Sequence, residues 1–376
     1  MMKYSKILLL LLLLLISACS EHPEAMVAET QTAEALLAAT ETVAVTLTAT
    51  PTVTATATQT PTATEIPPTP TITPTPWALS APSASGLLAG VTPMEYIENP
   101  CTYLENKWGE GKAEPGTIVV PIMFHSILEP GKTPSKAEEI TTEYFEFFMD
   151  YARQLGFETI TTTELVDFLE NNAAIPKYSM ILILDDRRPD TPELFMPYLE
   201  ANDWTLTLAF PTTDTSSDEL WEKIEAYVAT GYVEVQSHGH NHVYLQDYTA
   251  TDVMEEEIYK PIEVIKEHFG TIAQALIWPG GNFTVDAVQM AREAGFEIGF
   301  TVYSRGPLMF NWIPLGAPEQ GMDDPLMVLP RAWSSAADVA LNKALQISQH
   351  NEALAVDAME LELLYYDLYC SDTTEN

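Results

Sequence analysis

The sequence has few basic residues for its length. Its 376 residues include 17 Lys and Arg against 54 Asp and Glu, which gives a formal net charge of −37 at pH 7. So acidic a chain repels nucleic-acid phosphates and anionic membrane surfaces, and we therefore exclude a role in nucleic-acid binding. The acidic side chains either form a well-solvated surface or recognise a basic partner.

The apolar run at the N-terminus is short. Two lysines precede the run Ile7–Ile16, which is followed by small residues and a cysteine. The run is too short for a comfortable membrane span and is typical of a secretory signal. Residues 16–19, Ile-Ser-Ala-Cys, resemble the bacterial lipobox, which implies a signal peptide over residues 1–18 and lipidation of Cys19. The alternative is an ordinary signal cut near Ala18 that leaves the cysteine free.

Cysteine is scarce, with three in the whole chain. Apart from Cys19, they are Cys101, just before the globular region, and Cys370, near its end. In an exported protein disulfides persist, so we predict a Cys101–Cys370 bridge that joins the two ends of the domain.

Residues 46–76 consist largely of Thr, Pro and Ala. Alternation of this kind favours a strand, but the prolines remove backbone donors and the apolar partners are mostly Ala, so an extended stalk is the better interpretation. We predict a disordered linker over residues 19–90 and a single globular domain over residues 91–376. The domain is expected outside the cytoplasm, lipid-anchored to the bacterial cell membrane.

From about Ile118 onward, short apolar runs alternate with amphipathic stretches, the pattern of an α/β fold. No repeat of 20 to 50 residues is visible. A distorted (β/α)7 barrel fits better than a doubly wound sheet, although spacing alone leaves the latter open. The predicted strands begin at Ile118, Ile160, Met180, Thr205, Tyr232, Ala275 and Ile298.

Three groups of residues follow predicted strands, where the functional side chains of such barrels gather. Asp185 and Asp186 close the apolar strand from Met180; they are either a pair of functional carboxylates or a solvated turn. His238 and His242, four residues apart, have a spacing that brings two imidazoles to one metal ion, with His240 pointing away or serving as a spare ligand. The third group, residues 278–283, has two glycines that let the backbone approach a ligand, although alone it signals only a turn.

In this order, the motifs resemble those of the polysaccharide deacetylase family, carbohydrate esterase family four. The resemblance spans residues 117–333. It is carried by five matches, VPIMFHSI with His125, GFETITTTEL from Gly156 to Leu165, ILDDR with Asp185 and Asp186, HGHNH from His238 to His242, and WPGG followed by AGF.

The resemblance implies roles for individual residues. Asp186, His238 and His242 correspond to the family's metal ligands, usually for Zn²⁺, and Asp185 to the general base that activates a metal-bound water. Arg331 corresponds to an arginine that orients the base by a bidentate ion pair. The resemblance also implies a substrate contact at the WPGG element, which consists of Trp278, Pro279, Gly280 and Gly281.

Several residues depart from the family pattern. Arg187 stands where the family has a glycine after the acid pair, and Arg188 follows it. A long cation beside the base either fills the cleft or lowers the pKa of the base. Gly239 replaces the usual Ser or Thr. A late Leu-x-His motif for the general acid is missing, which leaves His125, or His350 on a predicted helix, as the proton donor.

The sequence thus predicts a metal-dependent hydrolase that removes N-acetyl groups from a cell-envelope or extracellular polysaccharide. Its partners are an N-acetylated glycan and, through the lipid anchor, the membrane; we expect a monomer. Two alternatives stay open. One is a catalytically weakened relative that binds glycan at the cell surface, and the other is a deacylase or amidase acting on a small molecule.

Overall fold

The computed structural model describes residues 77–79 and 83–371. The predicted signal peptide, Cys19 and most of the linker lie outside the described residues. The chain divides into two units, and everything described belongs to the unit that begins at Ile72. Among the described helices, none is long and apolar enough to cross a membrane.

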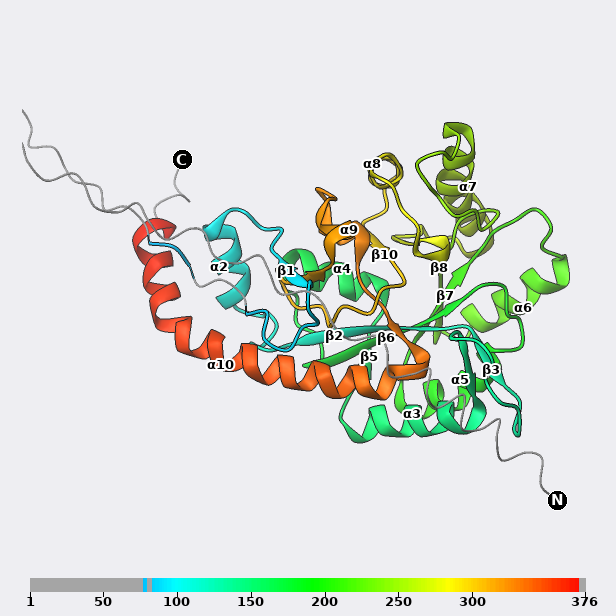
Figure 1. Ribbon diagram of the computed structural model, residues 1–376, viewed down its shortest axis with the longest axis horizontal. Coiled ribbons are helices and arrows are strands. Elements are labelled where there is room, and N and C mark those ends of the chain that lie inside the picture. Colours follow the sequence, from blue (N-terminus) through cyan, green and yellow to red (C-terminus); the bar gives the residue numbers. More distant parts are fainter. Residues whose placement is uncertain (1–76, 80–82, 372–376) are drawn as a thin grey trace, which may run out of the picture. The chain divides into compact units, whose positions relative to one another are not determined.

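A curled parallel sheet forms the centre of the domain (Figure 1). Within the described residues, seven strands follow one another across it in the order β10-β9-β8-β7-β6-β2-β12. The strands are β2 (Ile118–Phe124), β6 (Tyr178–Asp185), β7 (Leu206–Phe210), β8 (Val233–Ser237), β9 (Ala275–Ile277), β10 (Ile298–Phe300) and β12 (Ala332–Trp333). The long central strands are buried on both faces, which explains their nearly continuous apolar sequences.

The segment that ends in β12 links the two edges of the sheet. Leu329 pairs with Phe300 at the end of β10, and three residues later β12 pairs with Ile122 and Met123 of β2. The backbone N–H of Thr301 donates to the Leu329 carbonyl, and the Leu329 N–H donates to Gly299. These contacts curl the sheet into the distorted (β/α) barrel that the sequence predicts.

One predicted strand has a different place from the one expected. The run predicted to begin at Ile160 is β5 (Glu158–Thr159), which pairs only with β6 and lies off the path of seven strands. The seventh strand of the path is β12, which was not predicted because two residues carry no detectable alternation of polar and apolar side chains.

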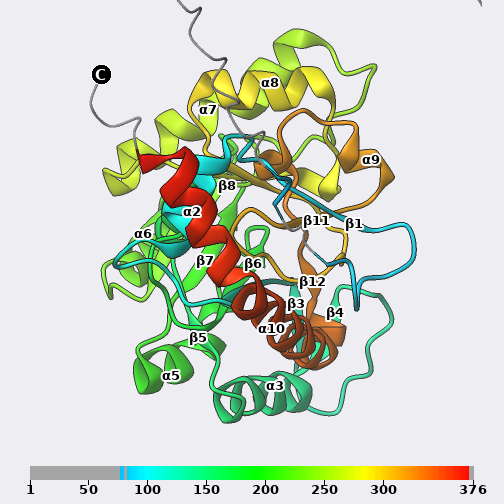
Figure 2. The same ribbon diagram turned by 90° about the vertical axis from the view of Figure 1, so that its left-hand side faces the viewer.

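Helices lie between successive strands, and Figure 2 shows α3 and α5 on one side of the sheet and α7 and α8 on the other. They are α3 (Thr142–Gln154), α4 (Thr162–Asn171), α5 (Pro192–Asn202), α6 (Asp218–Val228), α7 (Thr251–Phe269) and α8 (Val285–Ala294). Local signals set their ends: Thr161 and Glu164 form a capping box at the start of α4, and Gly295 in the left-handed conformation ends α8.

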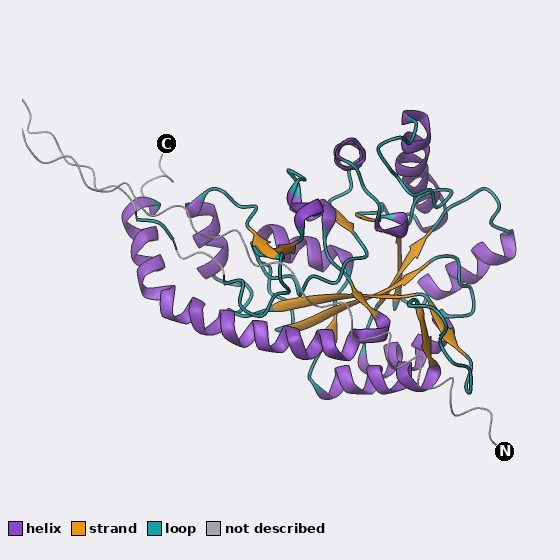
Figure 3. Cartoon of the chain, in the orientation of Figure 1, coloured by secondary structure: helices purple, strands orange, loops and turns teal. Residues whose placement is uncertain are grey.

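The two ends of the described domain meet beside the barrel. The helix α10 (Ala337–Tyr369) packs along β2 and α3, and its last turns pack on α2 (Pro100–Trp108) (Figures 1 and 3). The predicted disulfide between Cys101 and Cys370 is confirmed, with their Cα atoms 5.4 Å apart. Trp77, N-terminal to the predicted domain boundary, packs edge-on against Tyr365 of α10.

The remaining short elements complete the rim of the barrel. β1 (Thr92–Met94) pairs antiparallel with β11 (Ile313–Leu315), and β3 (Ser126–Leu128) pairs in parallel with β4 (Glu139–Thr141). The short helix α9 is Ala317–Gln320, and single 3₁₀ turns cover Pro279–Gly281, Pro325–Val328 and Ser334–Ala336.

Candidate metal centre

Asp185 and Asp186 lie at the carboxyl end of β6 and point to the same site. On a regular strand, successive side chains point to opposite faces. Asp186, however, has a positive φ of 73°, which turns the chain sharply after β6. Asp185 is buried at 2% exposure, whereas the side chain of Asp186 is about one-third exposed. The turn therefore provides one buried carboxylate and one at the mouth of the site.

His238 and His242 come from the loop that follows β8. Gly239 and His242 both have a positive φ, at 74° and 61°, so the loop coils back on itself. This brings the Nε2 atoms of the two histidines to 3.2 Å from each other. The Nδ1 of His238 lies 2.7 Å from the Ile277 carbonyl, which only a protonated nitrogen can contact favourably. Nε2 of His238 is therefore the atom with the free lone pair.

The three predicted metal ligands converge. Oδ1 of Asp186 lies 3.8 Å from Nε2 of His238 and 3.4 Å from Nε2 of His242, and one ligand atom from each residue falls within 4.8 Å of the other two. Burial, opposed by the Asp185 carboxylate, lowers the pKa of His238 to about 4, so its imidazole is neutral at physiological pH. Two imidazoles and one carboxylate are the kind of three-ligand donor set that catalytic Zn²⁺ sites use.

Asp185 does not share this role, because its carboxylate is held by a buried arginine. Nη1 of Arg331 donates to Oδ1 of Asp185 at 2.6 Å, while Nε donates to the Thr301 carbonyl at 2.8 Å. The predicted pair therefore forms through one N–H group and is not bidentate. Burial acts to raise the pKa of Asp185, but Arg331, with the nearby histidines, outweighs it and holds that pKa below its usual value.

His125 follows β2 and reaches the same carboxylate from the other side. Its Nε2 lies 3.5 Å from Oδ2 of Asp185, and its ring stacks on Trp333 at a centroid distance of 6.0 Å. Burial lowers the pKa of His125 even though Asp185 lies beside it. His350, the other candidate proton donor, is far along α10, where it contacts Ser83.

Residues 173–299 match the family of polysaccharide deacetylases. In this part of the chain, the sequence is similar to polysaccharide deacetylases. The matched residues include both acids and both candidate histidine ligands, and the family is one of carbon–nitrogen hydrolases.

Deacetylases are among the solved structures that match this chain. The Streptococcus pyogenes deacetylase PplD, in complex with acetate, is 17% identical, with a TM-score of 0.50 over 61% of this chain and 98% of that one. IcaB from Ammonifex degensii is 20% identical, with a TM-score of 0.49 over 62% of this chain and 100% of its own. No curated protein matches the sequence. At 17% identity, the likeness to PplD shows the fold alone.

Most of the WPGG element is buried in the core. Trp278 is fully buried and donates through Nε1 to the Met327 carbonyl at 2.7 Å, so its indole packs in the core and does not face a substrate. Pro279 and Gly281 are also buried, and only Gly280 is exposed, beneath the ring of Tyr244. The predicted substrate contact is thus limited to Gly280, and its role stays a prediction.

The two arginines after the acid pair behave differently. Arg187 is exposed and donates to the hydroxyls of Thr215 and Ser216, outside the candidate metal centre. Arg188 donates to Oδ2 of Asp186 at 2.8 Å and to the hydroxyl of Ser126 at 2.8 Å. Arg188 thereby leaves Oδ1 of Asp186 as the oxygen that faces the histidines.

Glu257 of α7 holds the loop that carries the two histidines, and its role was not predicted from the sequence. It is 2% exposed, and its two oxygens accept the backbone N–H groups of His240, Asn241 and Val243 at 2.7 to 3.1 Å. A Cβ on Gly239 would lie 2.4 Å from Oε2 of Glu257, which explains why glycine stands there. No signal marked Glu257, because it lies in the run Glu255–Glu257 on an amphipathic helix.

His240 lies in the same loop but does not face the three candidate metal ligands. Its ring is buried and contacts the hydroxyl of Thr212 at 3.0 Å and the carboxylate of Asp214 at 3.6 Å. The interpretation that His240 points away from the two ligand histidines agrees with this position.

Proposed function

We propose that this protein removes N-acetyl groups from a cell-envelope or extracellular polysaccharide, with one divalent metal ion, Zn²⁺, as cofactor. The observation that carries the proposal is the convergence of Asp186, His238 and His242 beside a second, buried carboxylate that does not belong to the ligand set. A metal site and a separate base together provide the two groups that metal-dependent amide hydrolysis uses.

Asp186, His238 and His242 fit the metal, since their donor atoms are close and at least one imidazole is fixed in the correct tautomer. Zn²⁺ bound there supplies a Lewis acid for the acetamide carbonyl and lowers the pKa of water toward about 7. Arg188 keeps one Asp186 oxygen out of the ligand set by its own hydrogen bond.

Asp185 serves as the general base. Its Oδ2 lies 3.9 Å from Nε2 of His238, next to the ligand cluster, while Oδ1 is occupied by Arg331. Because its pKa is held below the usual value, the carboxylate is ionised and takes a proton from water as the water oxygen attacks the acetyl carbon.

His125 is the group placed to donate the second proton. As the C–N bond of the tetrahedral intermediate breaks, the leaving nitrogen takes a proton from His125, and free amine and acetate result. Because its pKa is lowered, protonated His125 is a stronger acid than an ordinary imidazolium, and the nearby Asp185 supplies the proton that it took from water.

The proposed setting is the outside of the bacterial cell membrane, with Cys19 as the lipid-bearing residue. The support is the sequence of residues 1–19 and the Cys101–Cys370 disulfide, since such bonds persist in oxidising compartments.

A catalytically weakened glycan-binding protein is the second candidate. The observation that favours it is Arg188, whose guanidinium donates a hydrogen bond to Oδ2 of Asp186, one of the three candidate metal ligands. Arg187 gives this candidate no support, because its side chain is exposed outside the candidate metal centre. If Arg188 blocks the centre, Arg188→Ala will increase acetate release; if it orients Asp186, the variant will release less.

The experiment that tests the proposed function is acetate release from an N-acetylglucosamine oligomer, by chelator-treated protein with and without added Zn²⁺. Release that depends on zinc and is absent from Asp185→Asn is the expected result. Bound metal without release from any oligomer supports the glycan-binding candidate, and release that persists without metal overturns the mechanism.

A further inference from the structure

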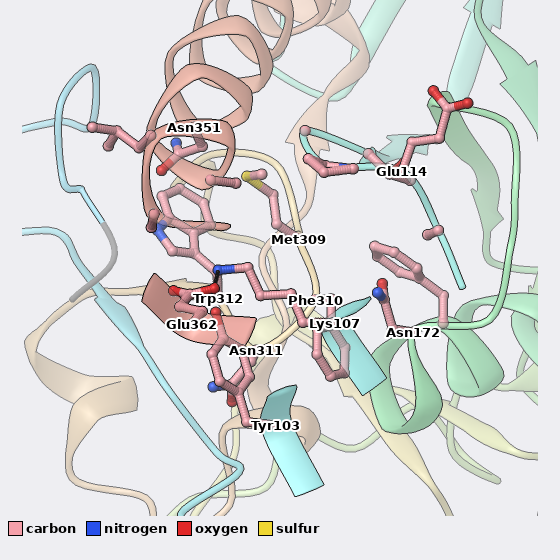
Figure 4. A pocket seen from close by; sticks show the side chains of 18 of the residues that line it. Tyr103, Lys107, Glu114, Asn172, Met309, Phe310, Asn311, Trp312, Asn351 and Glu362 are labelled. Atoms are coloured by element: carbon pink, nitrogen blue, oxygen red, sulfur yellow. Dashed lines mark hydrogen bonds and ion pairs between the residues drawn. The ribbon is translucent and has the colours of Figure 1, made fainter. Parts of the chain in front are cut away.

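A second pocket lies at the other end of the barrel from the candidate metal centre. It is lined by α2, the segment Ala113–Thr117, the turn Met309–Trp312 and the last part of α10 (Figure 4). Thr117 precedes the first residue of β2, whereas His125 follows the last. The seven residues of β2 therefore separate the two sites, by about 20 Å at the rise of an extended strand.

Three buried polar atoms of this pocket have no hydrogen-bond partner among the described residues. They are Oγ1 of Thr117, Nε1 of Trp312 and Oε1 of Glu362, and the three residues are 3%, 3% and 2% exposed. Nearly all buried polar groups in native proteins are paired, so three orphans lining one pocket indicate a molecule that pairs with them. Together they offer a donor, an acceptor and a hydroxyl that is both.

The walls that hold these atoms are rigid. Oε2 of Glu362 accepts from Nζ of Lys107 at 2.7 Å and from Nε1 of Trp108 at 2.8 Å, which fixes Oε1 in place; the Lys107 bond is drawn in Figure 4. Asn311, in the left-handed conformation, accepts two backbone N–H groups through Oδ1 and so fixes the turn before Trp312. The disulfide joins α2 to the end of α10.

The charge of the lining selects against anions. Glu95, Glu114 and Glu362 line the pocket, and the single cation of the lining, Lys107, is already paired with Glu362. Two carboxylates are therefore left without a cationic partner in the lining. A carboxylate or phosphate ligand is repelled, while a neutral or cationic ligand is accepted.

Aromatic rings and amides make up much of the remaining surface. Tyr103 and Phe310 stack in parallel at 6.0 Å, with Phe168 and Trp312 also in the lining and the amides of Asn172 and Asn351 among them. Flat apolar rings beside alternating donors and acceptors match a sugar, whose C–H face packs on an aromatic ring while its hydroxyls donate and accept.

The cavity has about 120 Å³ of space, roughly ten times what one water molecule needs on the same measure. We infer that this pocket binds a neutral or cationic hexose unit of a glycan at a site separate from the candidate metal centre. Binding there needs no metal ion and does not depend on the proposed hydrolysis.

The test is calorimetric titration of the full-length protein in chelator. The titrants are an N-acetylglucosamine oligomer, a glucosamine oligomer and, as the anionic counterpart, an oligogalacturonate. One or both of the first two should bind and the third should not; the first two arms separate a neutral from a cationic sugar. Binding of the oligogalacturonate alone, or of none of the three, which would leave water as the only occupant, overturns the inference.

Two variants place the binding in this pocket. Thr117→Val removes the orphan hydroxyl at nearly constant volume, and Trp312→Phe removes the orphan N–H; each should weaken sugar binding by about tenfold, the loss of one hydrogen bond in a desolvated site. The matched control is Trp204→Phe, a tryptophan equally buried elsewhere, which should bind like wild type. Asp186→Ala, which alters the metal centre, should keep the binding that the two pocket variants lose.

Folding is checked in the same samples by thermal unfolding. Thr117→Val takes away a hydroxyl that has no partner in the protein, so its Tm should equal or exceed that of wild type while its affinity falls. Unchanged affinity in both folded pocket variants, or an equal loss in Asp186→Ala, contradicts the assignment. Failure of the hydrolysis assay has no bearing on these titrations, because they contain no metal.

Discussion

Two adjacent carboxylates have different environments in this site. Asp185 is buried and paired with Arg331, whereas Asp186 is partly exposed and faces two histidines. The positive φ of Asp186 is what makes the difference, since it turns the second carboxylate back toward the end of the barrel. A base and a ligand thus come from consecutive residues.

Substitution of the two acids should separate metal binding from turnover. Asp186→Ala removes a ligand and should abolish stoichiometric metal binding. Asp185→Asn removes the base and should retain metal while acetate release falls by about 10²- to 10⁴-fold. Elemental analysis and acetate assays on the same samples check both results, and metal retained by Asp186→Ala contradicts the ligand assignment.

The acid stability of the metal-free protein should depend on His238. Its pKa is about 4 in the fold and about 6.5 in the unfolded chain, because burial disfavours the charged imidazole. Between these values only the unfolded chain binds the proton, so the stability that is complete above pH 6.5 is lost as the pH falls to about 4.

The comparison is between wild type and His238→Gln, both in chelator. The free energy of unfolding from urea titrations at pH 7 and pH 4 should fall by about 3 kcal/mol more in wild type than in the variant. Equal losses in the two proteins indicate that His238 is not held neutral by burial.

The sequence identifies the residues whose chemistry is unusual in their position. Acids at the end of an apolar strand and three histidines within five residues stand out, and the structure brings Asp185, Asp186, His238 and His242 together. Glu257 did not stand out, since a glutamate in a helix is ordinary, and Arg188 stood out only as a departure from the family pattern. Only the three-dimensional contacts show which backbone groups or carboxylates they hold.

At the scale of elements, the histidine loop depends on α7. Among the described residues of α7, Glu257 is the one whose side chain accepts the backbone N–H groups of residues 240, 241 and 243. The Glu257 carboxylate occupies the space that a Cβ on Gly239 would need, so the position of the carboxylate depends on glycine at residue 239.

Glu257→Gln should weaken metal binding without removing any ligand. The amide keeps the size of the side chain but replaces one accepting oxygen with an NH₂ group. This NH₂ group faces a backbone N–H group, so two donors oppose each other and one hydrogen bond is lost. We expect a loss of about 10- to 100-fold in zinc affinity, as for other residues that orient ligands. Glu256→Gln, on the exposed side of the same helix, is the matched control, and competition with a zinc-binding dye measures both.

The disulfide between α2 and the end of α10 should contribute to stability and leave the metal centre unaffected. It closes a segment with a sequence separation of 269 residues, which restricts the unfolded chain strongly. The double variant Cys101→Ser/Cys370→Ser should lose about 2–5 kcal/mol in urea unfolding. Its zinc affinity should equal that of wild type. A loss of zinc affinity in the double variant would show that the disulfide also influences the metal centre.

Elements with strong periodicity were predictable, and short ones were not. The helix predicted for residues 142–155 is α3, and the buried run from Met180 is β6. β5 and β12 have two residues each, too few for a pattern, and only pairing with β6 and β2 defines them. The disulfide was predictable because, after the lipobox cysteine, only one pairing was left.

On the scale of the whole molecule, the charge of −37 narrows the substrates. An acidic protein repels uronic acids and phosphate-rich polymers, whereas a neutral N-acetylated glycan is not repelled and its deacetylated product is cationic. The barrel carries the candidate metal centre at the carboxyl ends of its strands, and the pocket between α2 and α10 lies at the opposite end.

The most direct test of the account is a zinc titration of chelator-treated protein, in which bound zinc and acetate release from an N-acetylglucosamine oligomer are measured together. The account predicts that release rises in proportion to bound zinc and reaches its maximum at one zinc per chain. Release that is independent of zinc, or zinc bound at one per chain without any release, contradicts the central claim of a metal-dependent deacetylase.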